Sequence, residues 1–259
     1  MLNRSQLSSF RLSSSLALVT GLSLVLTACA LDSSHPQEDL GVAFEELNFN
    51  PNNLLNDSDL TNYSSLTAED IQAFLENTHC GNRSALADYT SNGKTAAQAI
   101  AEAASQYKIN PVEFLVRIQT ESSGICQKIT NYRMDRAFGC GCPDGAPCGD
   151  SFLGFDRQVS CAAKAFRSYM DDIANKGETI AGWAPNRTKS SLDPMKVTPA
   201  NAATAALYTY TPWVYNGGNQ LHWQVWQSIT AYLSKGGVVR ADTKPTTLPK
   251  TANDKIGTI

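Results

Sequence analysis

One acidic side chain stands where it could donate a proton. Glu121 ends an apolar segment, three positions after Ile118 and seven after Phe114. A helix would place these three side chains on one face and direct Glu113 and Arg117 elsewhere. A carboxyl group at the end of a buried stripe loses solvation in its charged form, so its protonated form is favoured near neutral pH. This pattern is that of a general acid acting on a glycosidic oxygen.

The residue types alone leave a structural interpretation open. A glutamate at a helix end often turns back to solvent or caps a neighbouring turn, without any part in chemistry. The sequence context of Glu121 therefore decides between the two interpretations.

The segment around Glu121 resembles the catalytic helix of lysozyme-like enzymes, especially of lytic transglycosylases. In those enzymes the helix has the form Asn-Pro, apolar residues, Gln and Glu-Ser. The matching residues here are Asn110, Pro111, Leu115, Ile118, Gln119, Glu121 and Ser122. The resemblance implies that Glu121 is the acid and base for cleaving the β-1,4 link between N-acetylmuramic acid and N-acetylglucosamine in peptidoglycan.

Two further stretches, 137–148 and 201–212, are similar to a bacterial cell-wall family with a lysozyme-like domain. With 66–75 and 94–104, the resemblance covers most of residues 60–235. It implies a substrate-binding set made of Ser122, Phe138, Gly139, Tyr208, Tyr210 and Trp213. Literal Gly-Leu-Met-Gln and Ala-Tyr-Asn motifs of transglycosylases are absent from the sequence.

No second carboxylate stands out in the sequence. Retaining and inverting glycosidases use two carboxylates, and the candidates here are Asp135, Asp144, Asp150 and Asp156. Each fits a loop-capping or solvated aspartate as well. The transglycosylase route needs one acid and uses a hydroxyl of the substrate to close an anhydro ring, so we expect a lytic transglycosylase.

Three alternatives remain open at this point. The first is a hydrolytic muramidase, and the second is a non-catalytic module of the same fold that binds glycan or an envelope partner. The third is a disulfide-rich surface adhesin.

Two further aromatic residues, Trp223 and Trp226, are predicted to lie in the core, because they share a helical spacing with Ile229.

Other chemistries lack support in the sequence. Histidine occurs only at positions 35, 79 and 222, without an H-E-x-x-H pair, and no glycine-rich phosphate loop is present. His222 lacks the sequence context of a triad base, so we expect a structural role for it. The sequence predicts neither a cofactor nor a bound metal.

The N-terminus has the pattern of a targeting segment. Arg4 and Arg11 precede a short apolar run, and Leu26-Thr27-Ala28-Cys29 ends it. The run is too short for a spanning helix. Its ending resembles the lipobox of bacterial lipoproteins, which implies cleavage after residue 28 and a lipid on Cys29; an ordinary secretory signal or a membrane anchor is the alternative.

This ending also bears on location. Ala30 is not the aspartate that favours inner-membrane retention in enteric bacteria, so we expect the outer membrane, facing the periplasm. In a cell with one membrane the protein would sit on its outer face.

Cleavage after residue 28 would remove Arg4 and Arg11. The remaining chain has 19 basic and 24 acidic side chains and a net charge of −5, which excludes the basic surface typical of nucleic-acid binding.

The remaining six cysteines form an even set that suits three disulfides in an oxidising compartment. They are Cys80, Cys126, Cys140, Cys142, Cys148 and Cys161. The turn-rich residues 143–147 favour a Cys142–Cys148 pair, and the sequence does not choose the other pairs. Zinc bound by Cys140, Cys142 and Cys148 is the competing interpretation.

The elements that must position these residues are helical. Capping residues and apolar periodicity predict helices starting at Thr67 and over 95–107, 111–124, 158–175, 200–207 and 220–233, and only 237–239 suggests a strand. We therefore expect a mainly α, lysozyme-like domain with disulfide-bonded loops over 66–236. A lipoprotein signal (1–28) and a lipid-anchored flexible linker (29–65) would precede it, and a flexible tail (237–259) would follow.

Overall fold

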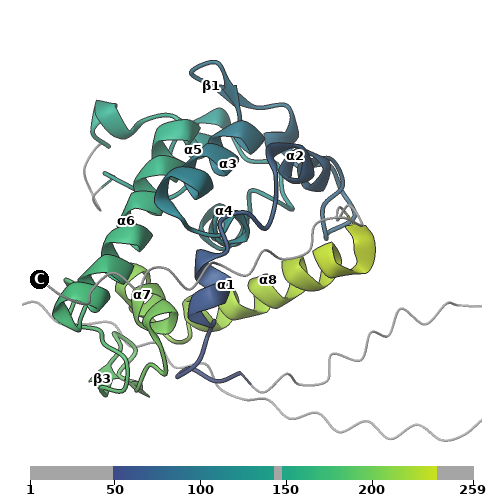
Figure 1. The fold of residues 1–259 in the computed structure, drawn as a ribbon. Helices are drawn as coiled ribbons and strands as arrows, with labels where there is room; N and C mark the ends of the chain where they lie inside the picture. Colours follow the sequence, from purple (N-terminus) through teal and green to yellow (C-terminus); the bar gives the residue numbers. More distant parts are fainter. Residues whose placement is uncertain (1–48, 143–147, 238–259) are drawn as a thin grey trace, which may run out of the picture. The chain divides into compact units, whose positions relative to one another are not determined.

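A buried helix, α4 (Pro111–Ser122), is the element around which the other helices are arranged. In the computed structural model, which describes residues 49–142 and 148–237, every residue from Pro111 to Ile118 is buried. Figure 1 shows α4 nearly along its axis, with α2 and α3 on one side and α8 on the other. The last turn of α4 extends beyond this enclosed part.

The start of α4 is fixed by Asn110. Its Oδ1 accepts hydrogen bonds from the backbone N–H of Val112 at 3.0 Å and from the Ser65 hydroxyl at 2.6 Å. Its Nδ2 donates to the backbone oxygen of Asp59 at 2.7 Å. Pro111 suits the first helical position because the N–H that it lacks would have had no helical partner. Asn110 thus caps α4 and ties it to an earlier segment.

The predicted helices are all present. The other α-helices are α1 (Asp57–Thr61), α2 (Ala68–Glu76), α3 (Ala96–Tyr107), α5 (Asn131–Met134), α6 (Phe155–Lys176), α7 (Ala202–Tyr210) and α8 (Asn219–Tyr232). Shorter turns are η1 (Ala85–Ala87), η2 (Asp150–Phe152) and η3 (Leu233–Gly237). The prediction of a mainly helical domain is confirmed.

The strands form two antiparallel hairpins of minimal length. β1 (Thr90–Ser91) pairs with β2 (Lys94–Thr95), and β3 (Lys189–Ser190) pairs with β4 (Lys196–Val197). Thr90 lies opposite Thr95, and Lys189 lies opposite Val197. Two residues per strand give no alternating pattern, which is why the sequence did not predict them.

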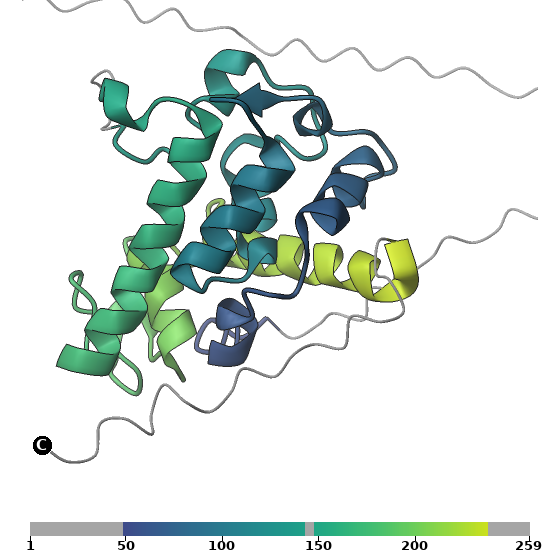
Figure 2. The ribbon, with the colours of Figure 1, turned by 45° about the horizontal axis from the view of Figure 1, so that its top comes forward.

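Helices α3 and α6 pack side by side (Figures 1 and 2). The face of α3 consists largely of alanines, and small side chains let two helix backbones approach closely. α6 begins after Gly154 (φ 108°) and ends at Gly177 (φ 80°), two backbone conformations that favour glycine. This pair forms the layer on the opposite side of α4 from α8.

Residues 49–65 belong to the domain, and the prediction of a flexible linker reaching residue 65 is wrong for this part. The side chains of Leu54, Leu55 and Leu60 are buried. The backbone N–H of Leu54 donates to Oγ1 of Thr204 in α7 at 3.0 Å. Leu54 and Leu55 are adjacent and Leu60 follows five positions later, so the three leucines show no helical period, although each occupies a core position here.

Several predictions lie outside the described residues. They are the signal segment 1–28, the lipidation site Cys29, the linker up to residue 48, Asp144, the strand at 238–239 and the tail from 238 onward. Gly237 itself lies in the π-helical turn η3. Among the residues that are described, none of the helices combines the length and apolar character needed to cross a membrane.

The six cysteines in the described part of the chain form three pairs. They are Cys80–Cys126, Cys140–Cys161 and Cys142–Cys148, with Cα–Cα distances of 5.7, 6.2 and 4.0 Å. The predicted Cys142–Cys148 pair is confirmed. A zinc site formed by Cys140, Cys142 and Cys148 is contradicted because Cys140 pairs with Cys161 in α6 instead.

The cap at Asn110 should stabilise the whole domain. Asn110→Ala removes the cap of α4 and leaves the carbonyl of Asp59 and the hydroxyl of Ser65 without this partner, so we expect a loss of about 2 kcal/mol in the free energy of unfolding. Urea unfolding without reductant measures it. Thr130→Ala removes the exposed cap of α5 and should cost less than about 1 kcal/mol; equal losses in the two variants would contradict the role of Asn110.

Candidate active site

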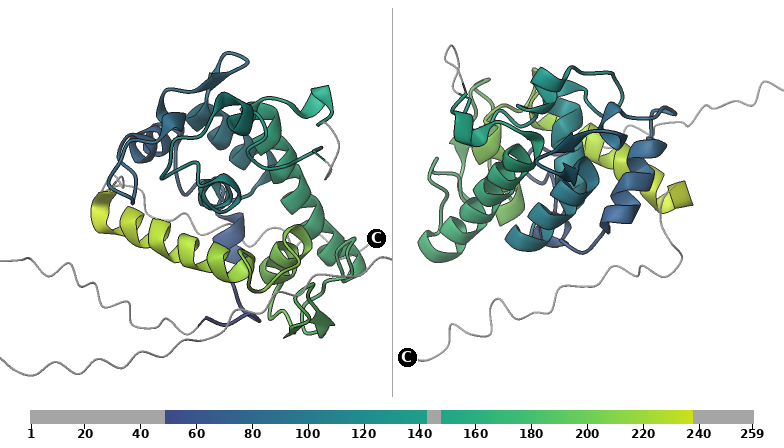
Figure 3. Two further views of the ribbon diagram at one scale, coloured as in Figure 1. Left: turned by 180° about the vertical axis from the view of Figure 1, so that it is seen from behind. Right: turned by 90° about the horizontal axis from the view of Figure 1, so that it is seen from above.

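An open cleft of about 460 Å³ lies where the last turn of α4 meets the end of α7 and the start of α8. Figure 3 shows these three helices from behind, with α8 running past α4 and α7 beside its first turn. Four residues predicted from the sequence line the cleft: Glu121, Phe138, Tyr210 and Trp213. The other lining residues are Arg117, Thr120, Thr211, Pro212, Gly217, Gly218 and His222.

Glu121 is at the edge of the core and open to solvent. Its side chain is 40% exposed, and its Oε1 lies 3.8 Å from Nη1 of Arg117. We expected burial beside Ile118 and Phe114, which are themselves fully buried. The expectation fails because α4 is enclosed only as far as Ile118, so the last turn emerges into the cleft.

A buried ionic cluster that the sequence did not predict lies behind Glu121. Glu113 and Arg117, expected to point away from the core, are 0% and 1% exposed. Nε of Arg117 donates to Oε1 of Glu113 at 2.9 Å, and its Nη1 donates to Oγ1 of Thr211 at 2.8 Å. Nε2 of His222, from α8, lies 2.9 Å from Oε2 of Glu113. A helix buried on all sides hides polar residues that periodicity would assign to an exposed face.

Charge within this cluster is balanced. Burial by itself would raise the pKa of Glu113, but attraction by His222 and Arg117 outweighs it, so the pKa of Glu113 lies below its usual value. Burial lowers the pKa of His222, although Glu113 opposes this shift. At neutral pH, Glu113 and Arg117 are therefore an ion pair, and a neutral His222 donates to the carboxylate.

Tyr210 covers the guanidinium group of Arg117. The Tyr210 ring centroid lies 4.5 Å from Cζ of Arg117, and the ring stacks on Phe166 with centroids 4.8 Å apart. Its hydroxyl donates to the backbone oxygen of Phe138 at 3.0 Å, and desolvation raises the pKa of Tyr210. Tyr210 thus connects the ionic cluster to the loop that carries Phe138.

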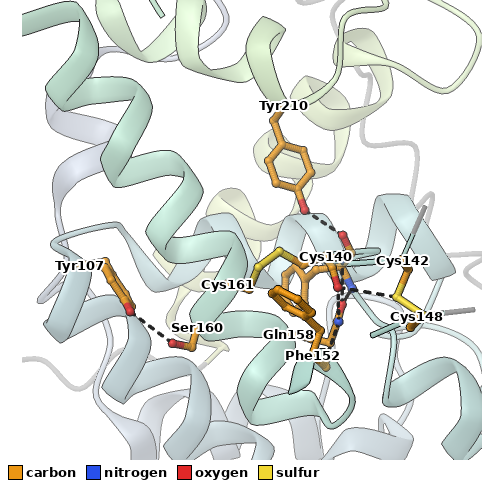
Figure 4. The surroundings of a disulfide bond; sticks show 10 residues. Tyr107, Cys140, Cys142, Cys148, Phe152, Gln158, Ser160, Cys161 and Tyr210 are labelled. Carbon is orange, nitrogen blue, oxygen red and sulfur yellow. Dashed lines mark hydrogen bonds between the residues drawn. A yellow bond between two sulfur atoms is a disulfide. The ribbon is translucent and has the colours of Figure 1, made fainter. Parts of the chain in front are cut away.

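This loop is fastened to α6 by a buried glutamine. Nε2 of Gln158 donates to the backbone oxygens of Cys140 and Phe152, each at 2.7 Å, and its Oε1 accepts from the N–H of Cys140 at 3.0 Å. The Cys140–Cys161 disulfide joins the same two elements (Figure 4). Gln158 was not predicted as a site residue, because a glutamine in a predicted helix carries no signal that it is buried.

The loop that carries Trp213 is held by Asp193, which lies between β3 and β4. Oδ2 of Asp193 accepts from the N–H of Tyr215 at 2.7 Å and Oδ1 from that of Val214 at 3.0 Å. Partial desolvation opposes the effect, but these bonds and one from the Ser191 hydroxyl lower the pKa of Asp193. A Cβ at Gly218 would lie 2.4 Å from the backbone oxygen of Trp213, so only glycine fits there. Asp193 and Gly218 were not predicted from the sequence.

Three predicted substrate-binding residues lie outside the cleft lining. Tyr208 is fully buried, stacks on Trp183 and donates to the backbone oxygen of Pro51 at 3.0 Å. The hydroxyl of Ser122 donates to the backbone oxygen of Ile118 at 2.8 Å. Gly139 occupies a turn with φ 63°. Tyr208 is a core residue, and the geometry gives Ser122 and Gly139 no direct place in the site.

The remaining candidate residues have structural partners. Asp135 accepts from the hydroxyl of Tyr89, Asp156 accepts from Ser91 and Asn92, and Asp150 starts the turn η2. None of these three aspartates lines the cleft. Trp226 is buried as predicted, whereas Trp223 is partly buried and lies edge-on to Phe49 at 5.6 Å.

Comparison of the chain with known protein families, with curated proteins and with solved structures gives no match in any of the three searches. The functional interpretation therefore depends on the residues of the site and on their sequence pattern.

The buried His222 should make stability depend on pH. Because its pKa is lower in the folded state than the usual 6.5, the unfolded chain binds more protons just below pH 6.5, and stability should rise with pH through this window. Glu113, whose pKa is lowered, adds stability that is lost as pH falls below 4.5. Urea unfolding at a series of pH values measures both effects.

His222→Gln keeps a neutral donor beside Glu113 and should flatten the dependence below pH 6.5. His79, whose pKa burial also lowers, provides the matched control, since His79→Gln should retain the part due to His222. An unchanged slope in His222→Gln would show that His222 is not the titrating group.

Proposed function

We propose that this protein is a lytic transglycosylase of lysozyme-like fold that cleaves the β-1,4 link between N-acetylmuramic acid and N-acetylglucosamine in peptidoglycan. The observation that carries the proposal is the convergence of Glu121 with Phe138, Tyr210 and Trp213 around one open cleft. The resemblance of residues 110–122 to a transglycosylase helix supports it. An exposed carboxyl group beside the exposed ring of Trp213 suits a sugar chain, because aromatic faces pack against the apolar faces of sugar rings.

In the proposed reaction, Glu121 first acts as a general acid and donates its proton to the glycosidic oxygen as the bond to the muramic acid carbon breaks. A hydroxyl group of the same muramic acid then attacks that carbon and closes an anhydro ring. The Glu121 carboxylate accepts the proton of this hydroxyl and is regenerated as an acid. No water is consumed.

The number of carboxyl groups in the cleft supports the transglycosylase reaction, which needs a single acid. Among the described residues that line the cleft, Glu121 is the only acid. Glu113 lies behind it, and its carboxylate is occupied by Arg117 and His222. A hydrolytic muramidase would need another group to activate water.

A second candidate function is glycan binding without cleavage. The observation in its favour is the exposure of Glu121, since the expectation of a general acid assumed a carboxyl group enclosed by apolar side chains. On either function, the sequence pattern at 26–29 supports an envelope protein held to a membrane by a lipid on Cys29, with peptidoglycan glycan strands as the partner.

Replacement of the acid should abolish cleavage. We expect Glu121→Gln to lower the rate of peptidoglycan digestion by at least about 100-fold, because the general acid is lost while the shape of the side chain is kept. The full chain in detergent is incubated with purified peptidoglycan, and mass spectrometry identifies soluble products. Glu76→Gln, an exposed glutamate at the end of α2, is the control and should digest normally.

The products separate the candidates. Anhydro-muramyl ends formed by the unmodified chain and absent with Glu121→Gln support the transglycosylase, and reducing muramic ends would replace it by the muramidase. Binding without any cleavage, equal in the unmodified chain and Glu121→Gln, would favour the binding module.

Trp213 should contribute to glycan affinity. Its side chain is 39% exposed in the cleft, and we expect Trp213→Ala to weaken binding of peptidoglycan fragments about tenfold, or ~1.4 kcal/mol, through loss of ring stacking. Calorimetry with soluble fragments measures it in the Glu121→Gln background. Tyr132→Ala removes an aromatic that is exposed outside this cleft; an equal loss there would exclude a specific role for Trp213.

A further inference from the structure

Glu113, Arg117 and Glu121 are spaced four residues apart along α4, so one guanidinium group lies between two carboxylates. Nε of Arg117 is 2.9 Å from Oε1 of Glu113, whereas its Nη1 is 3.8 Å from Oε1 of Glu121. The inner carboxylate is fully buried, and the outer one is open to the cleft. Glu113 is therefore the principal counter-ion of Arg117.

The other titratable groups packed around Arg117 carry no charge at neutral pH. They are Tyr210 from α7 and Tyr169 from α6, whose pKa values desolvation raises, and His222 from α8, whose pKa burial lowers. The ion pair of Glu113 and Arg117 is thus neutral as a unit. Glu121 faces this neutral unit and not an unbalanced cation.

If Glu113 lost its charge, Glu121 would lie beside a guanidinium group whose charge is no longer balanced. A buried cation needs a counter-ion. Of the described residues, Glu113 and Glu121 are the two whose carboxylates lie within 4 Å of Arg117. Glu121 would then become the counter-ion of Arg117 and would hold a proton less readily.

We infer that Glu113 is a positioning residue for the proposed reaction: it neutralises Arg117, so that the guanidinium group next to Glu121 does not favour the charged form of the Glu121 carboxyl. This inference rests on the proposed function and adds to it the residue that sets the pH range over which Glu121 carries a proton. Glu113 itself does not touch the cleft, since Arg117 lies between.

Glu113→Gln tests the inference because it removes the charge and keeps an oxygen that can accept from Arg117 and His222. A general acid works in its protonated form, so activity falls as pH rises past the point where it ionises. We expect the alkaline limb of kcat/KM against pH to move to lower pH by about one unit or more, as for a carboxyl group beside an unbalanced arginine. Glu178→Gln, which removes an exposed partner of Arg187, should leave the limb in place.

A second measurement does not depend on turnover. Carbon-13 NMR of labelled glutamate side chains in the full chain follows the ionisation of Glu121, assigned by its absence in Glu121→Gln. Its titration midpoint should fall in Glu113→Gln and stay unchanged in Glu178→Gln. A shift in a chain that cleaves no glycan would refute the proposed function and leave the electrostatic role of Glu113 standing; an unmoved midpoint in an active chain would refute the role of Glu113 alone.

Glu113→Gln leaves a buried cation and could prevent folding, so a second variant removes both charges. Glu113→Gln with Arg117→Met contains no unbalanced buried charge. If the pair is neutral as a unit, the titration midpoint of Glu121 in this double variant should stay close to that of the unmodified chain. A rise of about one unit would show that Arg117 already dominates Glu121 and would overturn the inference.

Discussion

The charge on Arg117 must be neutralised inside the core, and the packing around α4 follows from this requirement. A buried cation is tolerated only when its counter-ion and hydrogen-bond acceptors are buried with it. Glu113 supplies the charge from α4 itself, and Thr211 supplies an acceptor just after α7. His222 from α8 satisfies the carboxylate of Glu113 in turn. Three segments distant in sequence are thereby held in one arrangement, and the cleft lies where they meet.

Much of the fold could be predicted from the sequence, because most helices carry local signals. Helix starts are marked by the capping residues Thr67 and Thr95 and by the Asn110-Pro111 pair, and Gly177 marks a helix end. Segments without a repeating pattern escaped prediction, such as 49–65, where Leu54, Leu55 and Leu60 are buried without a helical period. A short helix such as α5 and hairpins with two-residue strands have too few positions for a period to appear.

The site could be predicted in part. Glu121, Phe138, Tyr210 and Trp213 do gather at one cleft, but Tyr208 does not join them. Because α7 continues to Tyr210, residues two apart point to opposite faces, so Tyr208 enters the core where Tyr210 turns to the cleft. Glu113, Gln158 and Asp193 were missed for one shared reason. Each is a polar residue that also bonds a residue outside its own helix or turn, namely His222 for Glu113, Cys140 for Gln158 and Val214 for Asp193, and no local pattern encodes such a partner.

The contact between residues 49–60 and α7 has a consequence for the order of folding. The hydrogen bond between Leu54 and Thr204 spans 150 positions, and that between Pro51 and Tyr208 spans 157. Closing such long loops lowers the conformational entropy of the chain before the contact can stabilise the fold, so we expect these contacts to form late. A nascent chain releases 49–60 first but must wait for 200–208 before that segment can pack. The domain is thus completed by its own beginning.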